Sequence, residues 1–384
     1  MKKRIMFLES RYDSFYGAQK SMLKLIKGLK SQRFVSKVVT TEDGELKRNL
    51  ESCNVKVDVV KLGKSSNVFG GRVLNYSIIK KIVVLFQLIF YNLKLVRYIF
   101  HNKIDIIYVN DSRALLYTLL ASKILNKKIV WYIRADISNS IITRICLRHS
   151  DYIITIANGV LRNLPLKTIN KYKIKTTNIY TGFDFDTFNV INKRKAKKML
   201  DIPDNCNVIG YLGSIHQRKG IDTLVDSYIN LTKYDKNVFL LIVGNISQGY
   251  KKYFDLQLSK LEKEKVPFKY IPYTNKVSEI YSAMDIFVLP SKSEGLPRVI
   301  IEAMGHKVPV IVTDVGGTKE IVVNKDYGLF FDVGDSNDLT NKLIELLRDN
   351  NYREALSKKG NEFVLERFSD NKFIEEINHF FERI

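Results

Sequence analysis

The sequence predicts an α/β protein made of two doubly wound domains of similar size that face each other across a cleft. Its length of 384 residues suits two domains better than one. Short β-rich runs alternate with helical stretches from one end to the other, which is the pattern of parallel sheets covered by helices on both faces. Apolar residues make up 45% and charged residues 27% of the chain, so it can bury two cores and is not disordered.

Six strands are expected in each half, each a short run of apolar residues bounded by polar or turn-forming ones. In the first half they are Arg4–Glu9, Val35–Thr40, Val55–Val60, Ile104–Val109, Ile129–Ile133 and Tyr152–Ile156. In the second half they are Asn207–Leu212, Val238–Val243, Phe268–Tyr270, Ile286–Leu289, Val310–Thr313 and Gly328–Phe331. The expected helices include Ala18–Lys30, Ser112–Leu125, Asn337–Asp349, Tyr352–Arg367 and Ser369–Ile384, the last capped by Ser369–Asp370.

The boundary between the domains is expected where sheet periodicity stops and a basic run precedes the turn at Ile202–Asp204. This gives a basic N-terminal domain over 1–188, a linker over 189–200 and a C-terminal domain over 201–368. Residues 369–384 are expected to form a helix that packs back on the N-terminal domain. In folds of this kind ligands bind beyond the carboxyl ends of the strands, so the site is expected in the cleft between the domains.

Nearly all of the net charge of +22 lies in the first half of the chain. Residues 1–190 hold 33 basic and 13 acidic residues, whereas residues 191–384 hold 29 and 27. Such an asymmetry favours an anionic partner, which could be nucleic acid, anionic lipid or a phosphorylated substrate. The alternative is a general compositional bias with solvated basic residues. The three cysteines are far apart and unpaired in sequence, which favours a reducing compartment, the cytoplasm by default, and argues against structural zinc.

The most apolar stretch, Ile82–Leu93, is expected to be too short to cross a membrane. Twelve helical residues span about 18 Å of a hydrocarbon core about 30 Å thick. The surrounding segment Lys80–Lys103 mixes apolar residues with Lys and Arg, as helices that lie in a membrane interface do. A core-packed helix with a basic outer edge is the alternative. The N-terminus has only five apolar residues before Glu9, fewer than a signal peptide needs, and is expected to be a buried strand.

The densest chemical signal is the segment 290–323, PSKSEGLPRVIIEAMGHKVPVIVTDVGGTKEIV. A strand ending at Leu289 leads into a polar loop, after which Pro297 is expected in the first turn of a helix. Backbone amides at that helix start, with the helix dipole behind them, favour an anion such as phosphate. Glu294 and Glu302 can accept hydrogen bonds from vicinal sugar hydroxyls. The alternative is a solvated loop carboxylate and a capping or salt-bridged helix carboxylate.

Two further loops contain glycines and polar residues at the end of a predicted strand. The first, Gly210–Gly220, has glycines for a tight turn and the cations Arg218 and Lys219 for a diphosphate. It lacks the complete glycine patterns of dinucleotide and ATPase sites. The second loop contains Gly17, where the backbone can approach a phosphate closely. A plain loop glycine is the alternative there.

With these motifs, the chain resembles the retaining glycosyltransferases of family 4, which are nucleotide-sugar enzymes of the GT-B fold with two Rossmann-like domains. The resemblance runs from Gly17 through the Gly213–Gly220 loop to the segment with Glu294, Glu302 and Gly316–Gly317. It implies transfer of a hexose-type sugar to a saccharide or lipid-linked acceptor in the biosynthesis of cell-surface polysaccharide, such as capsule or O-antigen. It also implies an enzyme in the cytoplasm that can associate peripherally with the inner face of the membrane. The donor is expected to be a UDP- or GDP-sugar.

The resemblance also implies residue roles. Glu302 would bind the ribose hydroxyls, Glu294 the transferred sugar, and Lys219 the diphosphate. The implied donor-binding residues are Gly17, Gly213, Ser214, Lys219, Glu294, Gly295, Leu296, Arg298, Val299 and Glu302, and the implied catalytic set is Glu294, Lys219 and Arg218. Tyr270–Thr274 would lie near the base.

Two positions depart from the family pattern. Ser214 stands where the family usually has Arg, so a guanidinium would have to come from Arg218. Arg134, followed by Asp136, stands where many members have a His, and both are expected to contact the donor sugar or the acceptor. His216 is expected to be a loop residue. No carboxylate pair with metal-ligand spacing lies beside these loops, and Asp184 and Asp186 are interpreted as solvated acids, so we expect an enzyme without metal or cofactor.

Two other functions compete with this interpretation. A nucleic-acid-binding protein would use the basic first half, but the chain has no recognisable nucleic-acid-binding motif and no nucleic acid is expected as partner. A two-domain sugar phosphorylase or epimerase would share the architecture and differ in the acceptor.

Overall fold

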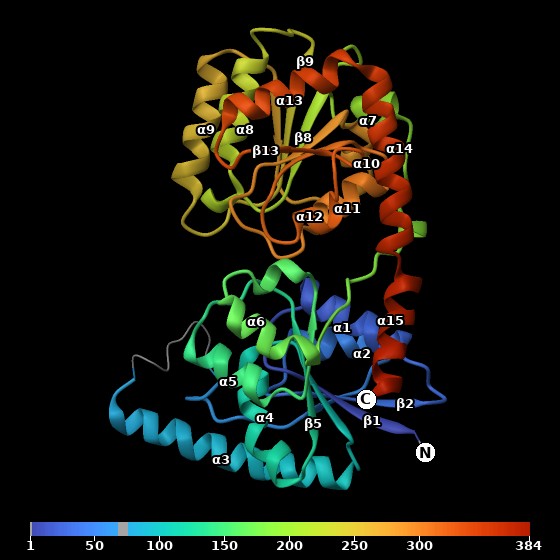
Figure 1. Cartoon of the computed structure of the whole chain (residues 1–384). Coiled ribbons are helices and arrows are strands. Elements are labelled where there is room, and N and C mark those ends of the chain that lie inside the picture. Colours follow the sequence, from blue (N-terminus) through green and yellow to red (C-terminus); the bar gives the residue numbers. More distant parts are fainter. Residues whose placement is uncertain (1, 68–75) are drawn as a thin grey trace. The chain divides into compact units, whose positions relative to one another are not determined.

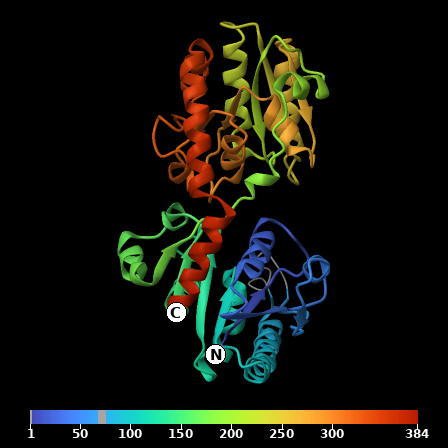
Figure 2. The same cartoon turned by 90° about the vertical axis from the view of Figure 1, so that its right-hand side faces the viewer.

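The computed structural model describes residues 2–67 and 76–384, which form two compact α/β units (Figures 1 and 2). Unit 1 comprises Met1–Thr181 together with Phe373–Ile384, and unit 2 comprises Gly182–Lys372. Each unit contains one parallel sheet with helices on both faces, as Figures 1 and 2 show. The predicted fold class of two doubly wound α/β domains is confirmed.

The sheet of unit 1 has seven parallel strands in the order β3-β2-β1-β4-β5-β6-β7. The strands are β1 Lys3–Glu9, β2 Phe34–Thr40, β3 Val57–Val59, β4 Ile106–Val109, β5 Lys128–Ile133, β6 Tyr152–Thr155 and β7 Thr176–Asn178. All six predicted strands are present within two residues of their expected bounds. The seventh, β7, was not predicted because its three residues are polar and lie at the edge of the sheet.

The sheet of unit 2 has six parallel strands in the order β10-β9-β8-β11-β12-β13. The strands are β8 Asn207–Leu212, β9 Val238–Val243, β10 Phe268–Ile271, β11 Ile286–Leu289, β12 Val310–Thr313 and β13 Leu329–Phe331. Strands β9, β11 and β12 are buried along their whole length, and β8 is buried along most of its length. Because both faces of these strands are covered, their sequences are nearly continuous apolar runs.

Helices connect the strands and cover both sheets. Those of unit 1 are α1 Gly17–Gly28, α2 Glu45–Ser52, α3 Ile78–His101, α4 Ser112–Ile124, α5 Ile141–His149, α6 Leu166–Tyr172 and α15 Asp370–Arg383. Those of unit 2 are α7 Lys193–Met199, α8 Ile221–Leu231, α9 Lys251–Lys263, α10 Val277–Ala283, α11 Arg298–Gly305, α12 Thr318–Ile321, α13 Ser336–Arg348 and α14 Asn350–Arg367.

The basic run that was expected to be a linker belongs instead to unit 2. Residues 193–199 form helix α7, which packs on α10. Lys193 and Lys197 pair with the two oxygens of Asp285 at 2.6 and 3.1 Å, and Lys197 also donates to the Cys206 carbonyl. Burial alone would raise the pKa of Asp285, but the two lysines and the Val208 amide lower it. The linker prediction was wrong because this charge run is paired with a buried carboxylate far along the chain.

The apolar segment of unit 1 forms a longer helix than the twelve-residue stretch suggested. Helix α3 has 24 residues, and at about 1.5 Å per residue it would be long enough to cross a membrane by length and composition. The expectation that this apolar segment forms a helix too short to cross a membrane was therefore wrong. Its buried residues Val84, Tyr91, Leu95 and Ile99 lie on one side, where α3 packs on α4.

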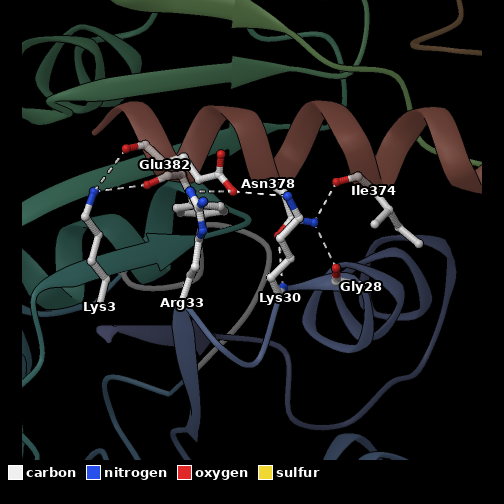
Figure 3. Close-up of polar contacts among 8 residues, drawn as sticks. Lys3, Gly28, Lys30, Arg33, Ile374, Asn378 and Glu382 are labelled. Atoms are coloured by element: carbon white, nitrogen blue, oxygen red, sulfur yellow. Dashed lines mark hydrogen bonds and ion pairs between the residues drawn. The ribbon is translucent and has the colours of Figure 1, made fainter. Parts of the chain in front are cut away.

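The last helix, α15, packs on unit 1 through apolar and polar contacts (Figure 3). Phe381 is fully buried and its ring lies 6.1 Å from Phe34 and 6.4 Å from Tyr108. Asn378 accepts from the Lys30 amide and donates to the Gly28 carbonyl, so it satisfies backbone groups at the end of α1. The C-terminal helix is thus part of the core of the first unit, although about 190 residues separate it from the rest of that unit.

Replacing Phe381 with Ala is expected to destabilise unit 1 by about 3–5 kcal/mol, because the change leaves a cavity against β2 and β4. Hydrogen exchange would show lower protection in β1 and β4 with β8 unchanged. The control is Phe100→Ala, since Phe100 is 75% exposed. Equal protection in the two variants would show that α15 does not stabilise the unit.

Candidate functional site

The predicted donor-binding loops of unit 2 follow two neighbouring strands at the point where the strand order reverses. Strand β8 pairs with β9 on one side and with β11 on the other. The loop after β8 contains Gly213 to Gly220, and the loop after β11 contains Pro290 to Pro297. In doubly wound sheets ligands bind beyond the carboxyl ends of the strands at such a position. The structure therefore brings the two sequence motifs to the edge of the sheet that is suited to a ligand.

A buried ion pair joins these two loops. The Lys219 ammonium lies 2.5 Å from Oε1 of Glu294, and the Ser291 hydroxyl donates to the same oxygen at 2.6 Å. The two charged side chains are only 13% and 9% exposed. The adjacent Arg218 donates to the Ser293 carbonyl at 3.0 Å. The three residues of the implied catalytic set thus contact one another or the same loop.

Two glycines permit the close approach of these loops. Gly220 has φ +71°, and a Cβ there would collide with the Pro290 carbonyl. Gly316 has φ +57°, and a Cβ there would collide with the Glu294 carbonyl. The next residue, Gly317, donates its amide to the Gly295 carbonyl at 2.6 Å. Since L side chains rarely adopt positive φ and would also collide, these positions favour glycine.

Glu302 lies on α11, one turn after Arg298. Its carboxylate is 3.9 Å from Nε of Arg298, and the Tyr281 hydroxyl donates to it at 3.3 Å. Burial raises the pKa of Glu302 more than Arg298 and Tyr281 lower it. His306, at the end of the same helix, packs between Tyr281 and Phe188. The supporting Tyr281 was not predicted, because nothing in its sequence context marks it.

The remaining predicted residues of unit 2 lie in the same loops. Pro297 is the N-cap of α11, one position before the first turn where it was expected, and Arg298 and Val299 begin the helix. The Arg298 guanidinium lies 4.1 Å above the Phe183 ring. Leu296 is buried, and the Ser214 carbonyl accepts from the Tyr211 hydroxyl. His216 packs near Tyr250, and burial together with Arg218 and Lys219 lowers its pKa.

The other predicted site residues lie in unit 1. Gly17 is the first residue of α1, after the N-cap Tyr16, whose amide donates to Gln19. A Cβ on Gly17 would meet nothing within 4 Å. Packing within the unit therefore does not explain the glycine, and a role in ligand approach stays a prediction.

Arg134 follows β5 and is held inside unit 1. It donates to Asn110, Ser21 and Tyr108 at 2.8–3.2 Å, and its guanidinium lies 3.9 Å above the Tyr132 ring. These contacts fix the guanidinium in one orientation at the carboxyl end of the sheet. Asp136 lies two residues further along. Contact of Arg134 and Asp136 with a sugar stays a prediction.

Sequence reasoning missed a carboxylate cluster beside Arg134. Glu9 ends β1 and is 1% exposed, while Asn110 and Asp111 follow the neighbouring strand β4. Glu9 accepts from the Asn110 side chain at 3.0 Å and from the Arg11 amide at 3.1 Å, and Ser10 donates to Asp111. Burial and the Asp111 charge raise the pKa of Glu9 to about 8. The sequence signal that could have predicted this cluster was the presence of polar residues at the ends of two buried strands.

In the described parts of the chain, 2–67 and 76–384, no group of three His, Cys, Asp or Glu side chains is placed to hold a metal ion.

Comparison with known proteins finds a family match within the second unit. Residues 192–363 match the family described as "Glycosyl transferases group 1". The matched segment lies within unit 2 and covers less than half of the chain. Among similar proteins, the "Capsular polysaccharide biosynthesis glycosyltransferase CapM" of Staphylococcus aureus is 29% identical over 208 residues, 54% of each chain. The "N-acetyl-alpha-D-glucosaminyl L-malate synthase" of Bacillus anthracis is 24% identical over 241 residues, 62% of this chain and 61% of the relative. The chain thus matches little more than half the length of these relatives.

Solved structures share the fold of the whole chain, which is the GT-B fold. The crystal structure of Anabaena Alr3699/HepE in complex with UDP superposes with a TM-score of 0.82 at 20% identity and covers 100% of both chains. The apo form of the lipopolysaccharide outer core galactosyltransferase WaaB gives a TM-score of 0.73 at 16% identity, over 99% of this chain and 100% of that one. The predicted resemblance to GT-B glycosyltransferases is confirmed.

The raised pKa of Glu9 predicts a pH-dependent stability. The native state holds a proton on Glu9 that the unfolded chain releases above about pH 4.5, so this contribution to stability is full below pH 4.5 and is lost as pH rises toward 8. Glu9→Gln keeps the neutral form at every pH. The difference in unfolding free energy between the variant and the wild type should therefore increase from pH 5 to pH 8 in favour of the variant.

Denaturant unfolding at several pH values would measure this difference. The control is Glu51→Gln on α2, whose side chain is exposed. A constant difference for Glu9→Gln between pH 5 and pH 8 would show that Glu9 is ionised in the native state.

Proposed function

We propose that this chain is a retaining hexosyltransferase that moves a sugar from a nucleotide-diphosphate sugar to a saccharide or lipid-diphosphate-linked acceptor in cell-surface polysaccharide biosynthesis. The observation that carries the proposal is the arrangement after β8 and β11. There, Lys219 and Glu294 pair, and α11 begins with Glu302 in its second turn. The loop after β8 offers cations and the start of α11 offers backbone amides to a diphosphate, and two carboxylates are available to sugar hydroxyls.

The relatives support this assignment. CapM is named for capsular polysaccharide biosynthesis, and LpsE of Rhizobium meliloti, 26% identical over 202 residues, for lipopolysaccharide core biosynthesis. The neighbouring HepE structures contain UDP, UDP-glucose or UDP with glucose. We therefore infer a UDP-sugar, with a GDP-sugar as the next candidate. That the reaction needs no metal or cofactor stays a prediction from the sequence.

In the proposed reaction, the bond between C1 of the sugar and the diphosphate oxygen breaks, and a bond from C1 to the acceptor oxygen forms on the same face of the ring. The proton of the acceptor hydroxyl passes to the departing diphosphate, so no protein base is required. Lys219, Arg218 and the start of α11 would stabilise the negative charge that develops on the diphosphate. Glu294 would orient the transferred sugar and Glu302 the ribose. Because the three cysteines are free, as is typical of proteins in a reducing compartment, we place the enzyme in the cytoplasm, peripheral on the inner face of the cytoplasmic membrane.

Glu302→Gln is expected to weaken donor binding about tenfold to a hundredfold, because two hydrogen bonds from hydroxyls to a charged acceptor become bonds to a neutral amide. The fold should persist, since the change removes a buried charge. A thermal-shift panel with UDP-, GDP- and ADP-sugars would measure binding as a rise in melting temperature. The control is Glu345→Gln on α13, which is 45% exposed. Equal donor-induced shifts in both variants would contradict the role of Glu302.

Gly17→Ala is expected to leave stability unchanged or slightly higher, since the new Cβ has free space and Ala favours helices. If a phosphate approaches this backbone, sugar transfer should fall at least tenfold. Turnover and melting temperature measured together separate these effects. The control Gly249→Ala changes a loop of unit 2 that no donor role was assigned to. Because its φ of +86° strains an alanine, this variant should lower the melting temperature without lowering turnover. Wild-type turnover in Gly17→Ala would remove Gly17 from the site.

A further inference from the structure

Helix α3 leaves an extended apolar surface exposed. Its buried residues lie on the side that packs on α4, and the Asn92 side chain accepts from the Ala121 amide of α4 at 3.0 Å. The other sides carry ten exposed large apolar side chains: Ile78, Ile79, Ile82, Val83, Leu85, Phe86, Ile89, Phe90, Leu93 and Phe100. Figure 1 shows α3 along an edge of unit 1, with its N-terminal end extending past α4 and α5 in this view. Exposed patches of this kind in soluble proteins mark interaction sites.

The exposed apolar residues form a continuous stripe. Ile82, Phe86, Ile89, Leu93 and Phe100 are separated by four, three, four and seven residues, which places them on one face of a helix. The residues buried against the unit lie on the opposite face. The stripe therefore faces away from the core of unit 1 along most of the helix.

Positive charge borders this stripe. Helix α3 contains Lys80, Lys81, Lys94 and Arg97 and no acidic residue. Lys94, Arg97 and His101 share a face beside the stripe, and together with Lys61 they line a pocket of about 410 Å³. This combination of apolar and basic faces is typical of helices that lie in the interface of an anionic membrane.

The charge of the first half distinguishes between possible occupants. A second copy of this chain would bring a second strongly basic surface against the first, since residues 1–190 carry 33 basic and 13 acidic residues. An anionic bilayer complements the same charge. A bilayer-spanning arrangement would require α3 to leave its contacts with α4 and the hydrogen bond between Asn92 and Ala121.

We propose that α3 docks unit 1 on an anionic lipid bilayer, with the stripe Ile82–Phe100 among the acyl chains near the headgroups and with Lys94, Arg97 and Lys61 holding headgroup phosphate. This inference deepens the proposed function, on which it rests for the side of the membrane. All residues of the proposed docking surface belong to unit 1. Docking would place the enzyme where a lipid-linked acceptor is held.

The test is co-sedimentation of the full chain with vesicles of phosphatidylcholine alone or mixed with phosphatidylglycerol. We expect binding to the mixed vesicles that weakens as salt rises. The double variant Phe86→Ser and Phe90→Ser should reduce partitioning at least tenfold, because both side chains are more than half exposed in solution and would be buried in lipid. Lys94→Glu and Arg97→Glu should each reduce it about fivefold or more.

Matched controls lie on unit 2. Leu256→Ser on α9 removes an exposed apolar side chain, and Lys251→Glu on the same helix reverses an exposed charge. Both should bind vesicles like the wild type. Donor-induced thermal shifts should be equal in all these variants, so loss of docking is separated from loss of the proposed catalytic function. Wild-type vesicle binding without any donor binding would contradict the proposed function and leave the docking surface intact.

Five outcomes would overturn the docking proposal. The first is equal binding to neutral and anionic vesicles, and the second is binding unaffected by the α3 variants. The third is concentration-dependent dimerisation that Phe86→Ser abolishes, which would assign the stripe to a second copy. The fourth is displacement from vesicles by glycerol 3-phosphate, which would assign the pocket to a soluble phosphate ester. Retention in membranes after alkaline carbonate extraction would overturn the interfacial geometry in favour of a spanning helix.

Discussion

The candidate donor site depends on backbone contacts that only glycine allows. Gly220 lies against the Pro290 carbonyl and Gly316 against the Glu294 carbonyl, both at positive φ. These approaches hold the loops after β8 and β11 together, and Lys219 can then meet Glu294 at 2.5 Å in a nearly buried pair. A larger residue at either glycine would separate the loops and leave two charges without partners in a poorly solvated position, which is costly. The geometry of the site thus depends on glycine at these two positions.

The same construction occurs at the switch point of the other sheet, but with different chemistry. Glu9 ends β1 and Asn110 follows the neighbouring strand β4, at the same end of the sheet as the donor loops after β8 and β11 in the other unit. Here the polar groups are directed at one another and at Arg134 rather than at an exposed loop. The buried Glu9 carboxyl, whose pKa is raised, and the fixed Arg134 guanidinium form a rigid polar cluster at the carboxyl end of the sheet. The two units therefore share a topology and differ in the charge that each presents at its edge.

The sequence predicted the parts of the fold that depend on local pattern. Buried parallel strands such as β9 and β11 are unbroken apolar runs, so their positions could be found directly. Strand β7 is three polar residues held by its neighbour β6, and no local pattern marks it. The donor motif was predictable because its residues are close in sequence. Tyr281 beside Glu302 and Glu9 beside Asn110 were not, since those contacts depend on strand order.

Charge patterns were informative only where no distant partner neutralises them. The basic run of α7 resembled a solvated linker, yet Lys193 and Lys197 share the buried Asp285, about ninety residues away. Among the residues that the structure describes, most ion pairs belong to unit 2, whose charges nearly balance. In unit 1, by contrast, the basic residues of α3 have no acid on their own helix. An excess of positive charge that no acidic residue neutralises exerts its field over about a Debye length, near 8–10 Å at moderate salt. It therefore influences which partners bind to that surface. Excess charge therefore predicts a partner better than a charged run does, because only the excess remains after the fold has paired what it can.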